Sequence, residues 1–374
     1  MNAIVPINMP KWGLSMEEGT IVEWLKPQGA IIEEGQELLE IETAKIVNVA
    51  ESPSSGVLRR IIAEAGAVVP VGALIGILAD ADTSEEELDD FANKFEEFSA
   101  VNKTEVAPFL QLSTIEADGR VLQIGRAGPD EGTPVVLVHG WAADLKSWQF
   151  NLEALAKLLP VYAIDLPGHG GSSKEVGDGS LANLANALGA VLDTLGLQRA
   201  HLIGHSLGGA VAARLAADRP EIAETLTLIA PAHMPGGQIS DEFLDGVISA
   251  GRARSLKPFL QMLVADPASV TREMVEDVLK YKRIDGVDTA LSVTRDRLSG
   301  DTDRVALQAD LAALAQRPGG VLIIASKSDR IVGVPDESAL PPGFQVRWIE
   351  AAGHLPHLER AGEVNAILIE RVCR

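Results

Sequence analysis

The sequence predicts a multidomain chain in which a small all-β domain precedes a larger α/β domain. Within the first 80 residues, short apolar segments punctuated by glycine repeat at an offset of 37. From about residue 107, apolar runs alternate with helical stretches, which is typical of an α/β fold with a parallel sheet. A length of 374 residues accommodates both domains. We therefore expect domains at 1–80 and 107–374, joined by a linker at 81–106.

The repeat extends over residues 3–79. Its offset places Gly29 and Gly35 on Gly66 and Gly72. Short strands separated by glycine turns predict a small all-β unit. Two copies joined by one hairpin would form a flattened barrel with internal two-fold symmetry. Because there are only two copies, we expect a closed domain rather than a solenoid.

Lys45 stands between the two halves of this repeat, directly after Glu42, Thr43 and one further residue. With the opening segment 9–19, this arrangement resembles the lipoyl domains of the 2-oxo-acid dehydrogenase type of complex, over residues 3–79. The resemblance implies a lipoyl-type flattened barrel with lipoate attached covalently to Lys45.

The residues beside Lys45 depart from that family. It usually has Asp before the lysine and Ala after it, where this chain has Ala44 and Ile46. Biotin-accepting relatives have methionine on both sides, which is absent here. Lipoylation is therefore favoured over biotinylation, and the alternative is an ordinary hairpin lysine.

Bulk composition limits the classes of partner. The net charge is −21, with 53 acidic and 32 basic residues, and such a surface repels nucleic acid and anionic membranes. The only cysteine is Cys373, so no disulfide framework is possible. No signal segment and no apolar run of membrane-spanning length is found. We expect a cytoplasmic protein without nucleic-acid, membrane or metal partners.

The sequence of the linker at 81–106 predicts an acidic amphipathic helix. Ser84 and Glu87 have the spacing of a capping box. One apolar stripe follows, formed by Leu88, Phe91, Phe95 and Phe98. Because several phenylalanines rarely stay exposed, we favour packing of this stripe on the chain's own second domain. Docking to a partner enzyme is the alternative.

In the second domain, the apolar runs predict strands buried on both faces of a sheet. These runs are 134–139, 161–165, 201–204, 226–230, 321–325 and 346–350. The stretches 181–195 and 207–219 between them predict helices. Residues 233–300 interrupt the pattern with charged helical sequence, which predicts a helical cap over the active site.

Gly204-x-Ser206-x-Gly208 falls between a predicted strand and a predicted helix, the context that this nucleophile motif requires. The glycines permit a sharp turn that exposes Ser206 at a helix N-terminus, where developing negative charge is stabilised. A serine hydroxyl is a weak nucleophile and needs an adjacent base.

Four further features follow the strands in a fixed order. They are His139-Gly140-Trp141, the segment 165–170, Asp329, and Gly353-His354-x-Pro356-His357. Together with the serine motif they resemble the α/β-hydrolase superfamily over residues 107–374. The resemblance implies that Ser206 is the nucleophile, His354 the base and Asp329 the acid that orients it. It also implies an oxyanion hole formed by the backbone N–H groups of Trp141 and Leu207.

Some residues allow a second interpretation. His357 is an alternative base, and the acid of this superfamily can follow a different strand. We expect His205 to have a packing role and His139 to support the oxyanion loop, while Asp165 and His169 organise a loop.

Nearly the whole chain resembles a family of acyltransferase components of acetoin dehydrogenase complexes, in which a lipoyl domain joins an α/β-hydrolase-like domain. This implies acetyl transfer from the lipoyl-lysine arm to coenzyme A within a multienzyme complex. The implied partners are a thiamine-diphosphate enzyme that cleaves acetoin and a dihydrolipoamide dehydrogenase. The His-x-x-x-Asp-Gly signature of the usual acyltransferase domain is absent, so the triad would have to perform the transfer.

Two alternatives to acetyl transfer stay open. One is an esterase or thioesterase fused to a lipoyl carrier domain, and the other is a carrier with a non-catalytic scaffold. Two basic groups of the predicted cap, at 252–257 and 280–283, are candidates for binding the phosphates of coenzyme A. We favour the interpretation that they are ordinary solvated helix faces.

Overall fold

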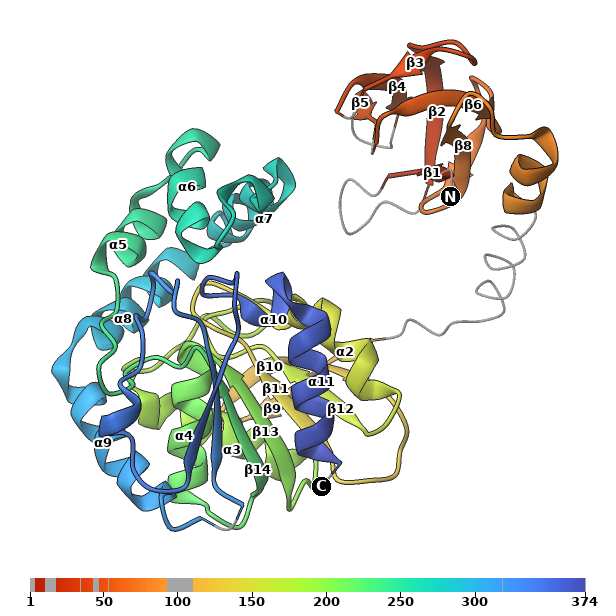
Figure 1. Cartoon of the computed structure of the whole chain (residues 1–374). Helices are drawn as coiled ribbons and strands as arrows, with labels where there is room; N and C mark the ends of the chain where they lie inside the picture. The colour runs from red at the N-terminus through yellow and green to blue at the C-terminus, as the bar shows by residue number, and fades with distance from the viewer. Residues whose placement is uncertain are drawn as a thin grey trace. The chain divides into compact units, whose positions relative to one another are not determined.

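The chain contains two compact units, Met1–Ala107 and Pro108–Arg374 (Figure 1). The structure is a computed structural model. It describes residues 4–10, 18–33, 35–42, 47–52, 54–92, 110–317 and 319–373.

The first unit is all-β up to residue 79 and contains two four-stranded sheets. Their strand orders are β1-β8-β6-β3 and β5-β4-β2-β7. The strands are β1 (Val5–Asn8), β2 (Glu18–Trp24), β3 (Ile31–Ile32), β4 (Glu37–Glu42), β5 (Val47–Glu51), β6 (Gly56–Ile61), β7 (Val68–Pro70) and β8 (Leu74–Ala79). Alternate residues of the strands form one buried core between the sheets, with Ile21 and Leu58 at equivalent positions of the repeat. The predicted all-β barrel is confirmed.

The internal repeat appears as a two-fold relation between backbone hydrogen bonds. Gly29 N–H donates to the Leu58 carbonyl at 2.7 Å, and Gly66 N–H donates to the Ile21 carbonyl at 2.7 Å. The two glycines have φ of 90° and 88°, a region that glycine adopts without strain. Each half therefore holds the other through an equivalent turn.

Lys45 lies outside the described residues. The strands that precede and follow it are paired in antiparallel register, with Glu42 opposite Val47 at their ends. Residues 43–46 connect these two paired strands in the sequence, and the prediction of a lipoyl site at Lys45 assumes such a hairpin connection. Modification of Lys45 stays a prediction.

The helix that follows β8, described over residues 85–92, packs on the first domain. Leu88 is fully buried in a cluster with Leu74, Ile77 and Ala79. The expectation that the stripe packs on the second domain is therefore wrong for its described part. The physical reason is that β8 leaves an apolar outer face next to the helix start. Phe95 and Phe98 fall outside the described residues.

Polar contacts fix the same helix. Ser84 and Glu87 form the predicted capping box, since Ser84 N–H donates to Glu87 Oε2 at 2.9 Å and Glu87 N–H donates to Ser84 Oγ at 3.3 Å. Arg59 and Arg60 on β6 both pair with Glu85 in its first turn. These pairs are exposed and contribute little individually, so Leu88 is the main anchor.

In the second unit, the described residues form an eight-stranded sheet of order β16-β15-β14-β13-β11-β12-β10-β9 (Figure 1). Its strands are β9 (Gln111–Ala117), β10 (Arg120–Ala127), β11 (Val135–Val138), β12 (Val161–Ile164), β13 (Ala200–His205), β14 (Ala223–Ile229), β15 (Val321–Ala325) and β16 (Phe344–Trp348). The strands from β11 to β16 are parallel, which confirms the predicted α/β class.

The antiparallel hairpin β9–β10 was not predicted. Its turn consists of Asp118 and Gly119, both with positive φ, and β10 pairs with β12 at the edge of the parallel strands. Leu112 and Val121 are exposed. The hairpin therefore lacks the continuous apolar run by which the buried strands are recognised.

Helices cover both faces of this sheet. Val136 and Val138 of β11 face a core with α3, α4 and α9, while Val135 and Leu137 face a second core with α2 and α11. The helices are α2 (Gln149–Ala156), α3 (Leu181–Thr194), α4 (Leu207–Asp218), α9 (Asp301–Leu314), α10 (Pro356–Glu359) and α11 (Ala361–Val372). No helix in the described parts of the chain has the length and apolar character needed to cross a bilayer.

The cap lies between β14 and β15, within the predicted range. It consists of α5 (Asp241–Ser249), α6 (Ala253–Leu260), η2 (Gln261–Leu263), η3 (Pro267–Ser269), α7 (Arg272–Lys282) and α8 (Val287–Ser299). Its buried side chains belong to the same core as α3 and α4. The cap is thus a packed part of the second domain.

Candidate active site

The predicted triad residues follow parallel strands, so they emerge at one edge of the sheet. Ser206 follows β13, Asp329 follows β15 and His354 follows β16. All three are buried. The register of β11 and β13 pairs Val138 with Gly204, which places the loop carrying Trp141 next to the serine turn. Ligand sites of open α/β sheets form at this carboxyl edge.

Ser206 occupies a strained turn. Its φ is 53° and its ψ is −118°, a conformation that non-glycine residues rarely adopt. A Cβ atom at Gly204 would lie 2.2 Å from the Gly208 carbonyl oxygen, and one at Gly208 would lie 2.3 Å from the His139 carbonyl oxygen. Both positions must therefore be glycine. Strain of this kind is typical of functional sites.

Asp329 and His354 form a direct hydrogen bond. The distance from His354 Nδ1 to Asp329 Oδ2 is 2.8 Å, while Asp329 Oδ1 accepts from the N–H groups of Ile331 at 2.8 Å and Val332 at 3.0 Å. Burial raises the pKa of Asp329, but His354 and these N–H donors outweigh it and hold that pKa below its usual value. An ionised carboxylate only accepts, so Nδ1 of His354 carries the proton and Nε2 is free to act as a base.

Both polar groups of the His354 backbone form hydrogen bonds. Its N–H donates to the Leu263 carbonyl at 2.7 Å, and its carbonyl lies 2.9 Å from His205 Nε2. A carbonyl can only accept, so His205 carries its proton on Nε2. His354 thus contacts the cap, the serine turn and the loop of Asp329 at the same time.

His357 has a different environment from His354. Its ring lies 4.5 Å from that of His205 and 4.8 Å from that of Trp148, measured between centroids. Neither of its ring nitrogens has a hydrogen-bond partner among the described residues. Burial lowers the pKa of His357 to about 3. Of these two histidines, His354 is the one bonded to Asp329, and His357 belongs to a neutral aromatic stack.

Two backbone donors are available next to Ser206. In the described parts of the chain, the N–H groups of Trp141 and Leu207 donate to no other backbone group. Leu207 is the first residue of α4, so its N–H lacks an intrahelical acceptor. The Trp141 ring is fixed by a bond from Nε1 to Thr294 Oγ1 of α8 at 3.0 Å. One unused donor at a helix N-terminus and one in the neighbouring loop suit an oxyanion hole.

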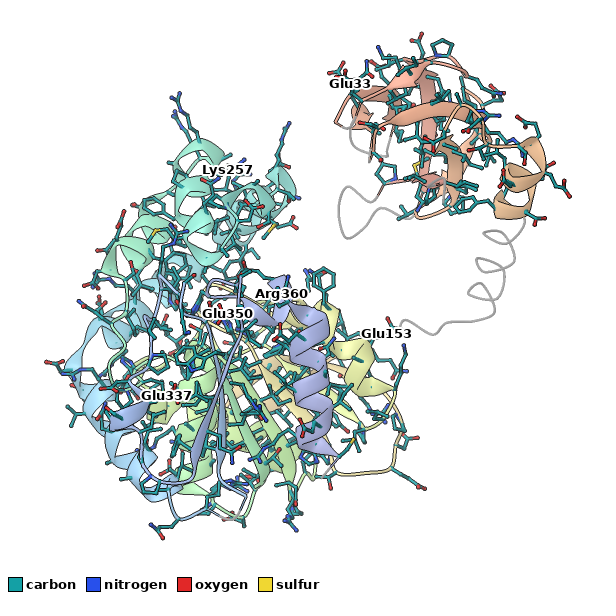
Figure 2. The ribbon with its side chains drawn as sticks, in the orientation of Figure 1. Glu33, Glu153, Lys257, Glu337, Glu350 and Arg360 are labelled. Atoms are coloured by element: carbon teal, nitrogen blue, oxygen red, sulfur yellow. The ribbon has the colours of Figure 1, made fainter. Side chains whose placement is uncertain are left out.

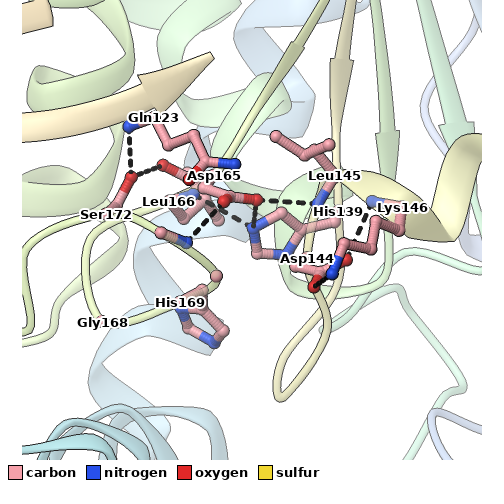
Figure 3. Close-up of polar contacts among 12 residues, drawn as sticks. Gln123, His139, Asp144, Leu145, Lys146, Asp165, Leu166, Gly168, His169 and Ser172 are labelled. Carbon is pink, nitrogen blue, oxygen red and sulfur yellow. Dashed lines mark hydrogen bonds and ion pairs between the residues drawn. The ribbon is translucent and has the colours of Figure 1, made fainter. Parts of the chain in front are cut away.

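A buried network supports the Trp141 loop (Figure 3). Leu166 N–H donates to His139 Nε2 at 3.0 Å, so the proton of His139 lies on Nδ1, 2.7 Å from the Gly140 carbonyl. The Asp165 carboxylate accepts from the N–H groups of Leu145 at 2.7 Å and Gly171 at 2.8 Å. These residues join the loops after β11 and β12.

One of the two basic groups of the cap is mostly engaged. Lys282 Nζ donates to three carbonyls at the end of α5, at 2.6 to 2.8 Å, and Lys280 pairs with Asp277. In the other group, Arg254 and Lys257 are exposed on α6. Figure 2 shows Lys257 on this helix. In the group at 280–283, Lys282 thus has a structural role within the cap, and coenzyme A binding by either group stays a prediction.

Sequence analysis missed three groups that link the triad loops to the cap: the Leu263 carbonyl, Arg330 and Glu359. Glu359 Oε1 accepts from Gly353 N–H at 2.7 Å. A glutamate five positions after a histidine carries no recognisable spacing. A backbone carbonyl carries no sequence signal at all.

The buried histidines predict acid sensitivity. Burial lowers the pKa of His357 to about 3, whereas an unfolded histidine titrates near 6.5. Between these values the unfolded chain binds more protons, so the free energy of unfolding falls as pH falls from 6.5 toward 3. Each such histidine contributes a slope on the order of 1.4 kcal/mol per pH unit.

We expect His357→Phe to take up about one proton fewer on unfolding and so to have a shallower slope. Phenylalanine can keep the stack on Trp148 without a titrating group. Denaturant unfolding between pH 7.5 and 5 measures it. The exposed-site control is Lys157→Gln, which should leave the slope unchanged. An unchanged slope in His357→Phe would contradict the assignment.

Comparisons with known proteins agree with this architecture. The model of the alpha/beta hydrolase family matches residues 135–367, and a model described as biotin-requiring enzyme, of the biotin/lipoyl type, matches residues 5–78. Fold and site thus define an α/β-hydrolase domain that follows a lipoyl-type domain.

Two relatives match almost the whole chain. Both are dihydrolipoyllysine-residue acetyltransferase components of an acetoin cleaving system. The protein from Cupriavidus necator is 38% identical, covering 98% of this chain and 96% of its own length. The protein from Pseudomonas putida is 40% identical, covering 98% and 97%. This chain belongs to their family, as the resemblance implied.

Solved structures show the fold of the second domain. A 2-hydroxy-6-oxo-6-phenylhexa-2,4-dienoate hydrolase from Rhodococcus aligns with a TM-score of 0.63 at 22% identity, covering 71% of this chain and 99% of the hydrolase. A meta-cleavage product hydrolase from Pseudomonas fluorescens aligns with a TM-score of 0.60 at 21% identity, covering 69% and 96%.

Proposed function

We propose that this chain transfers an acetyl group from a lipoyl arm on Lys45 to coenzyme A, with Ser206, His354 and Asp329 as the catalytic residues. The observation that carries the proposal is the Asp329–His354 bond at the edge where the strained Ser206 turn emerges. Relatives over 98% of the chain are acetyltransferase components by name.

Lipoate suits the first domain. The paired ends of β4 and β5 at Glu42 and Val47 leave four residues, Lys45 among them, to join the strands. When bound, lipoate supplies a thiol that carries the acetyl group as a thioester. Lys45 would hold it through an amide bond.

In the first half-reaction, His354 Nε2 takes the proton of Ser206 Oγ while the oxygen attacks the thioester carbonyl. Asp329 stabilises the resulting imidazolium. The N–H groups of Trp141 and Leu207 bind the developing oxyanion, each with a contribution of roughly 3 kcal/mol. As the carbon–sulfur bond breaks, His354 returns its proton to the leaving thiolate, and Ser206 carries the acetyl group.

In the second half-reaction, His354 takes the proton of the coenzyme A thiol, whose sulfur attacks the acetyl carbonyl. The ester bond to Ser206 breaks, and His354 protonates the serine oxygen. Water would give acetate by the same route, so transfer requires that water be excluded. The cap is the part of the domain suited to that task.

The family also suggests partners. We propose that a thiamine-diphosphate enzyme loads the arm, that a dihydrolipoamide dehydrogenase reoxidises it, and that all three act in one cytoplasmic complex. The names of the two relatives, which place them in an acetoin cleaving system, support this assignment.

One assay tests the acceptor. Purified chain is incubated with acetyl-dihydrolipoamide, with and without coenzyme A, and acetyl-coenzyme A and acetate are both quantified. We expect acetyl-coenzyme A to be the main product when coenzyme A is present. Acetate alone, at a rate indifferent to coenzyme A, would instead identify a thioesterase fused to a carrier domain.

A further inference from the structure

A short segment of the cap, residues 261–265, lies directly against the loop that carries His354. The N–H of His354 donates to the Leu263 carbonyl at 2.7 Å. A Cβ atom at Gly353 would lie 2.7 Å from the same oxygen and 2.9 Å from the Ala265 nitrogen. The two backbones are therefore as close as a glycine allows.

Glu359 joins this cap segment to the histidine loop. Its Oε1 accepts from Gly353 N–H at 2.7 Å, and its Oε2 accepts from Ala265 N–H at 2.7 Å. The carboxylate thus bridges the residue before His354 and the end of the cap segment. Arg360, the next residue, lies at the junction of α10 and α11 (Figure 2).

Arg330 holds the other end of the segment. Its guanidinium donates to the Gln261 carbonyl at 2.6 Å and reaches the Val264 carbonyl at 3.3 Å. Arg330 directly follows Asp329, the acid that bonds to His354. Both loops that carry the Asp–His pair therefore contact one piece of the cap.

We propose that Glu359 and Arg330 are positioning residues that clamp residues 261–265 and thereby align His354. This proposal rests on the proposed role of His354 as the base. If the cap segment moves away, the His354 N–H loses its acceptor on Leu263 and Glu359 Oε2 loses the N–H of Ala265, and a buried unpaired donor is costly. Seating of the cap and alignment of the base are then a single event.

This coupling suits a transferase. A cap that lifts admits water, but it also releases the backbone that fixes the base. Misplacement of a catalytic group by about 1 Å costs on the order of 100-fold in rate. The site is consequently least reactive when it is most open to water.

The test uses acetylation of the full-length chain by p-nitrophenyl acetate, with release of p-nitrophenol as the readout. In Glu359→Gln, one oxygen still accepts, but the amide NH2 faces the other N–H donor. We expect kcat to fall about tenfold with KM within about twofold of wild type, and about 100-fold in Glu359→Ala. The pH profile of kcat/KM should shift, because the surroundings of His354 change.

Glu363→Gln is the matched control, since it removes the same charge from an exposed site on α11. Rates are corrected for active-site content by fluorophosphonate titration. Should Glu359→Ala fail to fold, Arg330→Met replaces it, with an expected loss of about tenfold. Hydrogen exchange at Ala265 and His354 should accelerate in both Glu359→Gln and Arg330→Met.

His354→Ala separates the two proposals. If His354→Ala keeps the acetylation rate, the proposed role of the base fails. If His354→Ala loses that rate while Glu359→Gln and Arg330→Met keep wild-type kcat and pH profile, the clamp alone is overturned. Losses in these variants that match a loss of folded protein also overturn it.

Discussion

Ser206→Ala is expected to lower acetyl transfer to coenzyme A by at least about 10⁴-fold, because the acetyl group loses its covalent carrier between the two half-reactions. The neighbouring geometry should persist, since alanine has the volume to fill the turn and makes no new contact. Acetyl-coenzyme A formation from acetyl-dihydrolipoamide measures the effect. Electrophoresis after incubation with labelled acetyl donor should show no labelled Ser206→Ala protein.

Ser113→Ala, on the exposed face of the edge strand β9, is the matched control and should retain full activity. Transfer that persists in Ser206→Ala would show direct attack of coenzyme A on the arm's thioester. In that case the chain would position two substrates without an acyl-serine, and His354 would act only on the incoming thiol.

The strain at Ser206 gives this substitution a second consequence. At a φ of 53°, alanine has the same backbone strain as serine, whereas glycine adopts this region without strain. We therefore expect Ser206→Gly to be as inactive as Ser206→Ala but more stable, by about 1 kcal/mol. The strained conformation that the proposed nucleophile adopts thus lowers the stability of the wild-type turn.

The elements nearest the chemistry were predictable because their patterns are local. The strand ending at His205, the glycines around Ser206 and the helix from Leu207 form a contiguous signal that few other structures produce. The parallel strands are buried on both faces and read as continuous apolar runs. The half-exposed hairpin β9–β10 has no such run, and it was missed.

Long-range contacts explain the other misses. The apolar stripe that includes Leu88 predicted a buried helix face. Only the fold shows that Leu74 and Ile77 of the first domain cover it. Glu359 joins Gly353, six residues away, to Ala265, which is 94 residues away. A pattern within one segment predicts that a face is buried, not which surface buries it.

Lys45→Arg is expected to abolish every reaction that passes through the chain's own arm. Arginine keeps the positive charge, but its guanidinium cannot form the lipoyl amide, so intact-mass measurement of protein from lipoate-supplied cells should show no adduct. Acetyl-coenzyme A formation in the reconstituted complex, started from acetoin, should fall to background. Acetylation of Ser206 by free acetyl-dihydrolipoamide should persist at the wild-type rate, because the second domain is unchanged.

The matched control is Lys26→Arg in the same domain, which should retain both the adduct and full activity. An adduct that survives in Lys45→Arg would place the arm on another lysine. A wild-type chain without adduct would mean that Ala44 and Ile46 prevent recognition by the attaching enzyme. Restoring the family's Asp and Ala at these two positions should then produce the adduct, which would locate the defect in the flanks of Lys45 rather than in the barrel that presents it.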